Sequence, residues 1–412
     1  MKTHDINSHI RCLHADIHTN DLFEGIWPIP RGVSLNAFVA RGDKTALIDF
    51  VRDWEGAVSR LDAQLEAAGL RCQDVDYLIL NHLEPDHTGA LAEFRRRNPH
   101  AQILATAKGI KLIPSFYTID DDGLRAVRDG EALDLGQGVV LRFFETPNLH
   151  WPETMVTFEE ASGTLFSCDA FGSFGALGDR VFDDEFSGAE HAFFEGECLR
   201  YYANIVSSFS LFVEKAIVKL QGAVPAPGIR CVAPSHGIVW RKRPEAIIER
   251  YARYAAYARS GGEPEVCVVW GSMYGNTKAG LDAVIKGIAA AGVPYRLHRV
   301  PDEDLSYILA DGYRARGLVM AMPTYEYAMF PPMAWALDLF KRKHITGKKA
   351  LRIGSWGWVG GAQRDYEAAI AGLRWESAPA IEWAGQADSA TLAALEAAGK
   401  ALAQGLRVGT GP

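Results

Sequence analysis

Six consecutive residues, 82 to 87, carry four side chains that can bind a metal ion. They follow the apolar run Tyr77–Leu80, which predicts a buried strand, and Pro85 argues against a regular helix through the cluster. We therefore expect the cluster to form a loop at the carboxyl end of a strand. Four ligands in one loop are more than a single structural metal usually needs, so the sequence favours a centre with two metal ions. The four side chains belong to His82, Glu84, Asp86 and His87.

Three more strand-like runs each end shortly before another residue that can bind a metal. These runs cover residues 139–144, 164–168 and 230–234. An isolated histidine is more often an ordinary core or loop residue, but four strand ends that agree favour one shared centre at the edge of a sheet sandwich. The residues that follow the three runs are His150, Asp169 and His236.

The combined set contains three carboxylates and four imidazoles. Imidazole-rich sites suit zinc, whereas mixed imidazole and carboxylate sets suit iron, whose ferrous and ferric states both accept oxygen ligands. Three carboxylates would also stabilise two cations that are held close together. The ligand types therefore predict two non-haem iron ions.

The C-terminal third contains a second pattern, in which a strand leads through a short polar loop into a helix. The strand is predicted at Val266–Trp270 and the helix at Ala279–Ala291. Small and hydroxyl residues at this position expose backbone N–H groups at the positive end of the helix, which suits a phosphate group. The loop matches neither the nucleotide-triphosphate pattern nor the dinucleotide pattern, and it resembles the phosphate loop of flavodoxins. Its candidate phosphate-binding residues are Ser272, Met273, Tyr274, Gly275, Asn276 and Thr277.

Further strand-like runs at 295–300, 317–322, 351–356 and 378–383 alternate with helical stretches, which predicts a doubly wound parallel sheet. Two loops at the carboxyl ends of these strands combine aromatic residues with glycines. Aromatic rings there could cover the faces of an isoalloxazine ring, and glycines let backbone donors approach its polar edge. Together with the phosphate loop, these features predict that FMN binds. The residues concerned are Pro323, Thr324, Tyr325, Glu326, Ser355, Trp356, Gly357, Trp358, Gly360 and Gly361.

The length of 412 residues is large enough for two well-buried cores. Segment 258–264 is small, polar and rich in glycine, so we expect a linker there and α/β domains at residues 1–260 and 261–412.

The net charge of −8 gives no electrostatic case for nucleic-acid binding. No apolar run approaches membrane-spanning length, and the N-terminus lacks a basic region before an apolar core. We therefore expect a cytoplasmic protein that does not enter the membrane.

The six cysteines are scattered, and no Cys-x-x-Cys pair occurs among these residues. That spacing excludes a fused rubredoxin-type iron site or a ferredoxin-type cluster within this sequence. Electrons are therefore expected to arrive from a separate donor.

Four histidines near the N-terminus could suggest another metal site. Their spacing is irregular, and the residues around them alternate as in a strand. We expect them to be solvated or to lie on an edge strand. They are His4, His9, His14 and His18.

The loop at 82–87 resembles the His-x-His-x-Asp-His loop of the metallo-β-lactamase fold, with Glu84 in place of the second histidine. This glutamate variant is typical of flavodiiron proteins, and the resemblance covers essentially the whole chain. It includes the segments His150-Trp151-Pro152-Glu153, Asp169-Ala170-Phe171-Gly172 and Ser235-His236-Gly237 together with the flavodoxin-like loops. The resemblance implies an N-terminal αββα metallo-β-lactamase-like sandwich and a C-terminal flavodoxin-like domain. This is the A-type arrangement, which includes rubredoxin:oxygen oxidoreductases and nitric oxide reductases.

The resemblance also implies roles for the site residues and an activity. His82, Glu84 and His150 would bind one iron, Asp86, His87 and His236 the other, and Asp169 would bridge the two. Members of the family reduce dioxygen to water, nitric oxide to nitrous oxide, or both, with electrons that pass through FMN. The sequence leaves the choice between the two gases open. Expected partners are an electron donor such as rubredoxin, ferredoxin or a flavin reductase, and a second copy in a head-to-tail homodimer or a dimer of dimers.

Two other interpretations compete with this one. The first is a zinc hydrolase of the metallo-β-lactamase type with an attached flavin module, which Glu84 and the three carboxylates argue against. The second is a flavin-binding electron-transfer or redox-sensing protein whose lactamase-like part has lost its chemistry. All seven ligand positions are filled in this sequence, which argues against that loss.

Overall fold

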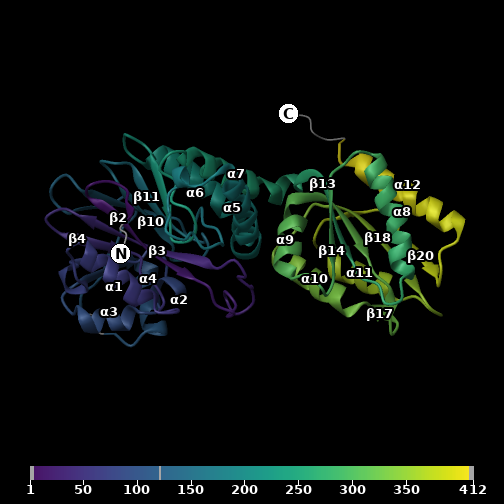
Figure 1. Ribbon diagram of the computed structural model, residues 1–412, viewed down its shortest axis with the longest axis horizontal. Coiled ribbons are helices and arrows are strands. Elements are labelled where there is room, and N and C mark those ends of the chain that lie inside the picture. The colour runs from purple at the N-terminus through teal and green to yellow at the C-terminus, as the bar shows by residue number, and fades with distance from the viewer. Residues whose placement is uncertain (1–3, 120–121, 408–412) are drawn as a thin grey trace. The chain divides into compact units, whose positions relative to one another are not determined.

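The structure is a computed structural model, and it describes residues 4–119 and 122–407. The chain divides into two compact units, Met1–Ala252 and Arg253–Pro412 (Figure 1). Within the described ranges, none of the helices combines the length and the apolar character needed to cross a bilayer.

The connection between the predicted domains is shorter than the sequence suggested. Helix α7 (Pro244–Ser260) continues into the predicted linker, and strand β13 (Glu263–Trp270) begins within it. Only residues 261 and 262 separate the helix from the strand, so the linker prediction of 258–264 was wrong in extent. Gly262 has a φ of +106°, and a Cβ there would lie 2.1 Å from the carbonyl oxygen of Arg314. This short connection therefore requires glycine.

The first unit contains two sheets. The larger sheet pairs antiparallel from β1 to β4 and parallel from β4 to β7, with helices in the crossovers that parallel pairing requires. In sheet order its strands are β1 (His4–Asp5), β2 (Ile10–Ile17), β3 (Val33–Arg41), β4 (Thr45–Ile48), β5 (Tyr77–Ile79), β6 (Gln102–Thr106) and β7 (Leu124–Val127). The second sheet consists of β12 (Cys231–Pro234), β11 (Thr164–Cys168), β10 (Met155–Glu159), β9 (Val140–Glu145) and β8 (Ala132–Asp134).

Helices cover the outer faces of the two sheets. Figure 1 shows α1, α3 and α4 on one side of the strands and α5, α6 and α7 on the other. The unit is therefore an αββα sandwich, which confirms the fold expected from the resemblance. The helices that precede α7 are α1 (Ala57–Ala67), α2 (Pro85–Thr88), α3 (Leu91–Arg97), α4 (Ala107–Phe116), α5 (Gly188–Tyr201) and α6 (Ser210–Ala223).

Parallel pairing brings several loops of the first unit to one edge. Strands β11 and β12 run parallel, so the residues that follow them emerge on the same side. Every residue of these two strands is buried, as expected for strands that are covered on both faces. The edge where such strands end is where the predicted metal ligands lie.

The second unit is built on one parallel sheet, which confirms the predicted doubly wound architecture. The order β14-β13-β15-β18, with β19 and β20 beyond β18, is the strand order of flavodoxin-like sheets. The other strands of this sheet are β14 (Tyr295–Arg299), β15 (Ala315–Ala321), β18 (Lys349–Trp356), β19 (Glu376–Ser377) and β20 (Ile381–Ala384). A separate hairpin consists of β16 (Thr324–Tyr325) and β17 (Ala328–Met329). The helices are α8 (Asn276–Ala290), α9 (Leu305–Arg314), α10 (Pro331–Arg342), α11 (Ala362–Ile370) and α12 (Ser389–Gly405).

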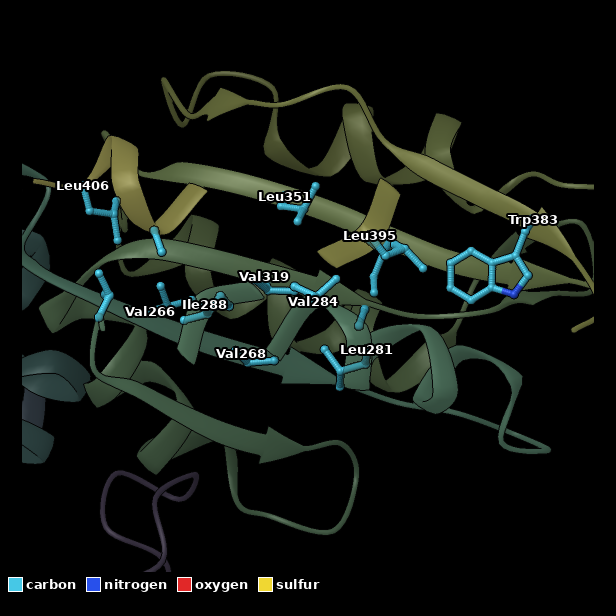
Figure 2. Packing of buried hydrophobic residues seen from close by; sticks show 14 residues of the cluster. Val266, Val268, Leu281, Val284, Ile288, Val319, Leu351, Trp383, Leu395 and Leu406 are labelled. Carbon is cyan, nitrogen blue, oxygen red and sulfur yellow. The ribbon is translucent and has the colours of Figure 1, made fainter. Parts of the chain in front are cut away.

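The core on one face of this sheet lies beneath helices α8 and α12 (Figure 2). Strand residues such as Val268 and Leu351 pack there against Val284 of α8 and Leu395 of α12, and all four are fully buried. The two helices approach closely at Gly399, where a Cβ would lie 2.2 Å from the carbonyl oxygen of Val284. Burial of this apolar surface is the main force that holds the helices on the sheet.

A buried histidine in the second unit is held between two carboxylates. His298 on β14 has Nδ1 2.9 Å from Glu303 Oε2 and Nε2 3.0 Å from Asp311 Oδ2. Burial alone would lower the pKa of His298, but hydrogen bonds to Asp311, Cys267 and Glu303 raise it to about 11. The imidazole is therefore a fixed cation that ties β14 to α9 and the loop before it.

Replacing His298 by leucine is expected to destabilise the chain at neutral pH by about 1–3 kcal/mol, because both carboxylates lose this cation. The folded-state pKa is raised, so the contribution of His298 is complete below the ordinary value of 6.5 and is lost as pH rises toward about 11. Thermal unfolding followed by circular dichroism should give the largest difference below about pH 6 and a small one near about pH 10. A difference that stays constant over this range would contradict the assignment.

Candidate metal centre and ligand pocket

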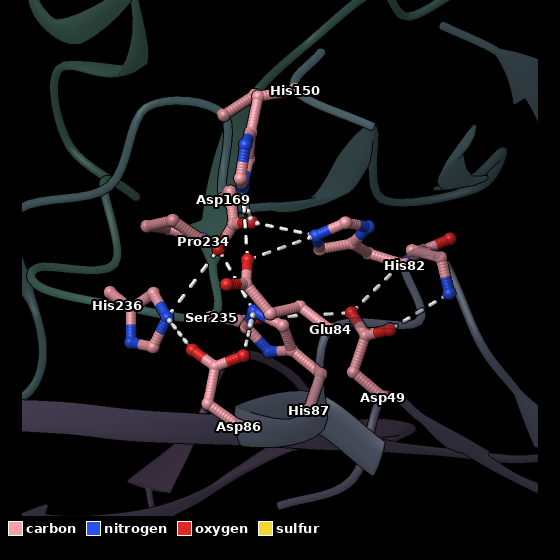
Figure 3. A network of polar contacts seen from close by, with 12 residues as sticks. Asp49, His82, Glu84, Asp86, His87, His150, Asp169, Pro234, Ser235 and His236 are labelled. Carbon is pink, nitrogen blue, oxygen red and sulfur yellow. Dashed lines mark hydrogen bonds and ion pairs between the residues drawn. The ribbon is translucent and has the colours of Figure 1, made fainter. Parts of the chain in front are cut away.

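The structure brings all seven predicted metal-binding side chains together at one edge of the first unit (Figure 3). They fall into two groups, and within each group one ligand atom per residue lies within 4.8 Å of the others. The first group is His82, Glu84, His150 and Asp169, and the second is Asp86, His87 and His236. Apart from Asp169, which the resemblance places between the two irons, the groups contain the residues that the resemblance assigns to each ion, and Asp169 also forms a further group with His87 and Cys168.

Asp86 and His87 lie on a helix, where the sequence had predicted a loop. Helix α2 is a single turn that starts directly after Glu84. Pro85 occupies its first position, where no backbone N–H is needed and the fixed φ of proline already suits a helix. The proline therefore starts this short helix, and the turn directs two ligands toward the centre.

Asp169 contacts all four imidazoles. Its Oδ1 lies 2.9 Å from Nε2 of His87 and 3.4 Å from Nε2 of His236. Its Oδ2 lies 3.2 Å from Nε2 of His150 and 3.4 Å from Nε2 of His82. One carboxylate oxygen thus faces each pair of imidazoles, which is the arrangement expected of a residue that bridges two ions.

The other two carboxylates each lie at one end of the cluster. Glu84 Oε2 is 3.0 Å from Nε2 of His150 and 3.3 Å from Nε2 of His82. Asp86 Oδ2 is 3.0 Å from Nε2 of His236. Each pair of imidazoles therefore has one carboxylate of its own besides the shared Asp169.

Two of the imidazole rings are fixed by hydrogen bonds of Nδ1, on the side that faces away from the centre. Nδ1 of His82 donates to Oε1 of Glu153 at 2.8 Å, and Nδ1 of His236 donates to the carbonyl oxygen of Ser34 at 2.8 Å. Because Nδ1 is the donor, Nε2 of the neutral ring carries a lone pair that points into the centre. Lone pairs of imidazole and carboxylate then face one another, and such an arrangement needs positive charge between them.

Protons on the Nε2 atoms would also supply positive charge between the ligands, and the pKa shifts of the cluster reflect this. Burial alone would lower the pKa of His236, but hydrogen bonds to Asp169 and Asp86 raise it to about 10. Burial alone would raise the pKa of Glu84, but hydrogen bonds from the imidazoles lower it to about 2. Among the described residues, Oδ1 of Asp86 and Oδ2 of Asp169 are buried with ion-pair contacts to the imidazoles but without a hydrogen bond. The cluster thus favours cations between its ligands, and a mixed nitrogen and oxygen donor set fits iron.

Two buried residues beside the centre were not predicted as site residues. Glu153 orients His82, as described above, and lies three positions after His150 in the chain. Tyr201 of α5 donates its hydroxyl hydrogen to Oδ1 of Asp169 at 3.0 Å. Glu153 could have been suspected from its place next to a ligand, whereas no local pattern connects Tyr201 to Asp169.

Two of the N-terminal histidines, which were expected to be solvated or to lie on an edge strand, are buried, and the expectation was wrong for His14. His4 lies on the edge strand β1, as predicted, but it is buried there. His14 lies on β2, and its Nδ1 is 2.9 Å from Oδ1 of Asn36 on the neighbouring strand β3. Neither belongs to a group that could hold a metal among the described residues.

The second unit has a cavity of about 360 Å³ at the carboxyl ends of its strands. Most of the residues predicted to bind FMN line it, from the phosphate loop and from both aromatic loops. The lining consists of Ser272, Met273, Tyr274, Asn276, Thr277, Pro323, Thr324, Tyr325, Glu326, Tyr327, Ser355, Trp356, Gly357, Trp358, Val359 and Gly385. Gly385 follows β20 and belongs to neither predicted loop.

Three predicted glycines, Gly275, Gly360 and Gly361, are not among the lining residues, and their binding role stays a prediction. Gly275 precedes α8 with a φ of +93°, a conformation that favours glycine. A Cβ at Gly361 would lie 2.0 Å from the carbonyl oxygen of Tyr327. Glycine there allows the two aromatic loops to approach each other.

The cavity combines a polar end with an aromatic rim. Thr277, in the first turn of α8, is buried, and its Oγ1 lies 2.9 Å from Oγ of Ser355. At the rim, Tyr274, Tyr327 and Trp358 are 91%, 60% and 79% exposed. A planar aromatic ligand with a terminal phosphate fits both ends, since the rings can cover its faces and the helix N-terminus can hold the phosphate.

A sandwich with a dimetal ligand set, joined to a doubly wound unit with such a cavity, defines a class of two-domain redox protein. Comparisons with known proteins agree. Residues 34–237 match the family model described as ODP family beta lactamase. The chain is similar to the anaerobic nitric oxide reductase flavorubredoxin of Vibrio vulnificus, with 32% identity over 372 residues that cover 89% of this chain and 72% of that protein. The flavorubredoxin of Salmonella arizonae is 35% identical over 335 residues, which cover 81% of this chain and 67% of that protein.

Solved structures give the same result. The rubredoxin oxygen:oxidoreductase of Desulfovibrio gigas superposes with a TM-score of 0.90 at 25% identity, over 98% of this chain and 99% of that chain. A variant of the flavo di-iron protein of Thermotoga maritima superposes with a TM-score of 0.85 at 26% identity, over 98% of both chains. The chain belongs to the flavodiiron protein family, and the resemblance found in the sequence is confirmed.

Proposed function

We propose that this chain is an oxidoreductase that uses FMN and two non-haem iron ions to reduce dioxygen to water, nitric oxide to nitrous oxide, or both. One observation carries the proposal: a single carboxylate, Asp169, contacts four imidazoles, while two further carboxylates lie at opposite ends of the cluster. The names of the relatives support both gases as substrates, since the flavorubredoxins are named for nitric oxide reduction and the Desulfovibrio gigas protein for oxygen reduction.

The ligand assignment follows the two groups of side chains. His82, Glu84 and His150 would hold one iron, Asp86, His87 and His236 would hold the other, and Asp169 would bridge them. The three carboxylates support iron over the imidazole-rich sites that suit zinc, so a zinc hydrolase is not favoured. When bound, the iron pair would supply electrons to the diatomic gas.

The surrounding residues hold the ligands in place and limit the access of water. Glu153 fixes the ring of His82, and Tyr201 holds one oxygen of Asp169. The ring of Trp151 packs edge-on against His82, with centroids 5.0 Å apart. Ligands fixed in this way can accept changes in charge with little rearrangement. The side chain of Glu84 is the most exposed of the ligands at 15%, which supports an approach for small gases from that side.

FMN is the flavin we assign to the cavity of the second unit. Its single terminal phosphate would occupy the N-terminus of α8 near Thr277, and its ring would lie between the aromatic loops. When bound, it would take electrons from a donor and pass them on singly. We infer that the donor site lies outside these 412 residues, as in a rubredoxin, a ferredoxin or a flavin reductase, because they contain no Cys-x-x-Cys pair. Six buried free thiols are in keeping with a cytoplasmic location.

We also propose a head-to-tail homodimer, alone or within a dimer of dimers, in which the FMN of one chain serves the irons of the other. A flavodoxin-like sheet binds its ligand at its own strand ends, whereas the metal ligands belong to a different sheet. The exposed aromatic rim of the cavity supports contact with another protein surface. Two-fold symmetry would create two equivalent flavin–iron contacts.

Co-expression of two inactive variants tests this assembly. One variant, Asp86→Ala with His87→Ala, should lack iron, and the other, Thr277→Glu, should lack FMN. If electrons pass between chains, random mixing should restore roughly a quarter of wild-type activity, because half of the dimers regain one of their two intact contacts. Differential tags would verify that mixed dimers form. Mixed dimers without activity would contradict transfer between chains.

The proposed activity is tested with protein that is loaded with iron and FMN and then reduced without oxygen. Gas electrodes should record consumption of dioxygen, nitric oxide or both. Free reduced flavin converts dioxygen to hydrogen peroxide, so water as the product, with no peroxide detected, distinguishes the iron-dependent reaction. Protein stripped of iron but loaded with FMN is the control. Loaded protein that consumes neither gas faster than this control would refute the proposed function.

A further inference from the structure

The loop that carries His236 is fastened to strand β3 by one asparagine. Nδ2 of Asn36 donates to the carbonyl oxygens of Pro234 at 3.0 Å and of Gly237 at 2.9 Å. These two carbonyl groups lie on either side of His236 in the chain. The backbone N–H of Asn36 also donates to the carbonyl oxygen of Ser235 at 2.8 Å. Asn36 is 1% exposed, so water does not compete for these bonds.

Ser34 adds two bonds from the same strand. Its carbonyl oxygen accepts from Nδ1 of His236 at 2.8 Å, and its Oγ accepts from the backbone N–H of Gly237 at 2.6 Å. Strand β4 pairs only with Phe38–Arg41 of β3, so the earlier part of β3 remains open to this loop. Residues two apart on a strand share one face, which lets Ser34 and Asn36 act on the same loop.

The hydrogen-bond partners of the Asn36 side chain determine which of its two terminal atoms is the nitrogen and which is the oxygen. Its nitrogen already donates to two carbonyl groups, so its oxygen must accept, and Nδ1 of His14 lies 2.9 Å from that oxygen. His14 is the cross-strand partner of Asn36. Gln64 fixes His14 in turn, since its Nε2 donates to the His14 carbonyl at 2.7 Å and its Oε1 accepts the His14 N–H at 2.9 Å. The amide therefore has one supported orientation.

We propose that Asn36, assisted by Ser34, is a positioning residue that holds His236 and thereby tunes the metal position formed by Asp86, His87 and His236. This inference rests on the proposed function and deepens it, because it assigns a determinant to one of the two metal positions. Of the segments that carry metal ligands, the hydrogen bonds described for Asn36 reach the one with His236, and the ligands of the other position come from other segments. Loss of these bonds should therefore act on one position and leave the other unchanged.

Two substitutions test the inference in the full chain. Asn36→Leu removes both N–H donors of the amide, and Asn36→Asp keeps the shape but places one carboxylate oxygen against the two carbonyl groups. Changes behind a metal ligand typically weaken metal binding by about 10–100-fold, so one iron should be lost that much more readily to a chelator. Mössbauer spectra of isotope-enriched protein should show one altered iron signal and one unchanged signal. These spectra are a readout that a general loss of stability would not change selectively.

Asn98 provides a matched control in the same unit. It is also buried, and its Nδ2 donates to the carbonyl oxygens of Cys72 and Val75, each at 2.8 Å. Its Oδ1 accepts from the N–H of Ala101 at 3.1 Å. Asn98→Leu should lower the unfolding temperature about as much as Asn36→Leu, yet leave both iron signals and their resistance to chelators unchanged.

The outcomes separate the inference from the function on which it rests. Two irons held by Asn36→Leu as tightly as by wild type, or both weakened in parallel, would overturn the role of Asn36. If Asn36→Leu does not fold, Ser34→Ala removes only the acceptor of one N–H group and should weaken the same single position by roughly threefold to tenfold. An unchanged Ser34→Ala would then overturn the inference. Wild-type protein that binds no iron pair would refute the proposed function itself.

Discussion

Replacing Asp169 by asparagine is expected to empty both metal positions and to abolish gas reduction. The two oxygens of this carboxylate lie 2.9–3.4 Å from the Nε2 atoms of four imidazoles, so each group loses anionic charge at once. The amide keeps the shape, but its nitrogen cannot bind a cation. Affinity for each iron should fall by about 100-fold or more. The measurement is the iron content per chain after gel filtration.

Asp183 offers a matched control for this substitution. It is as buried as Asp169, with 3% exposure for both, and it accepts from the backbone N–H groups of Arg241, Lys242 and Arg243. Asp183→Asn should cost some stability but keep both irons. Retention of two irons by Asp169→Asn would show that Asp169 does not bridge the metal ions.

The second large effect concerns the flavin. Replacing Thr277 by glutamate should remove FMN from the purified protein and leave its iron in place. Thr277 is buried in the first turn of α8, and a carboxylate there would repel the phosphate where the helix otherwise attracts it. Loss of a charge-assisted hydrogen bond together with like-charge repulsion should weaken FMN binding by about 100-fold or more. The flavin absorbance and the iron content of one sample measure both parts of the prediction.

Thr391→Glu is the control for Thr277→Glu, because it places the same charge in the first turn of another helix. It lies in the first turn of α12, where its N–H donates to the capping residue Asp388, and no predicted ligand lies nearby. Thr391→Glu should keep both FMN and iron, because a negative charge is favourable in the first turn of a helix. A Thr277→Glu protein with stoichiometric FMN would place the phosphate elsewhere. The isosteric Thr277→Val, which keeps the charge of the site, should weaken the flavin only moderately.

Local patterns in the sequence predicted the elements that carry the site. The strand-like runs before His82, His150, Asp169 and His236 are strands β5, β9, β11 and β12, or end close to them. Strand β5 belongs to the larger sheet and the other three to the second, and the residues that follow them meet at one edge of the sandwich, as four agreeing strand ends had indicated. The doubly wound second unit was predictable for the same reason, because each strand, loop and helix is short and regular.

Sequence patterns predicted the wrong local structure at two places, because the residues there are compatible with two backbone conformations. Proline disrupts the interior of a helix but suits its first position, and Pro85 occupies the first position of α2. Segment 258–264 reads as a linker by composition, yet Ala258, Arg259 and Ser260 can continue a helix until the glycines that follow.

Residues that support the ligands from a distance could not be predicted. Asn36 lies 198 positions before Pro234, whose carbonyl oxygen it binds, and Tyr201 lies 32 positions after Asp169. No periodicity or motif connects such pairs, because their contact depends on how two sheets and a helix pack. Their polar groups are recognisable only when burial and hydrogen bonding are known.

Metal analysis of the purified chain, from cells supplied with both iron and zinc, tests the central claim most directly. Three carboxylates among seven ligands predict about two irons per chain and little zinc. Iron in that amount, together with FMN, would agree with a flavodiiron reductase. A centre filled with zinc, in protein that keeps its fold, would contradict this account and favour the hydrolase alternative.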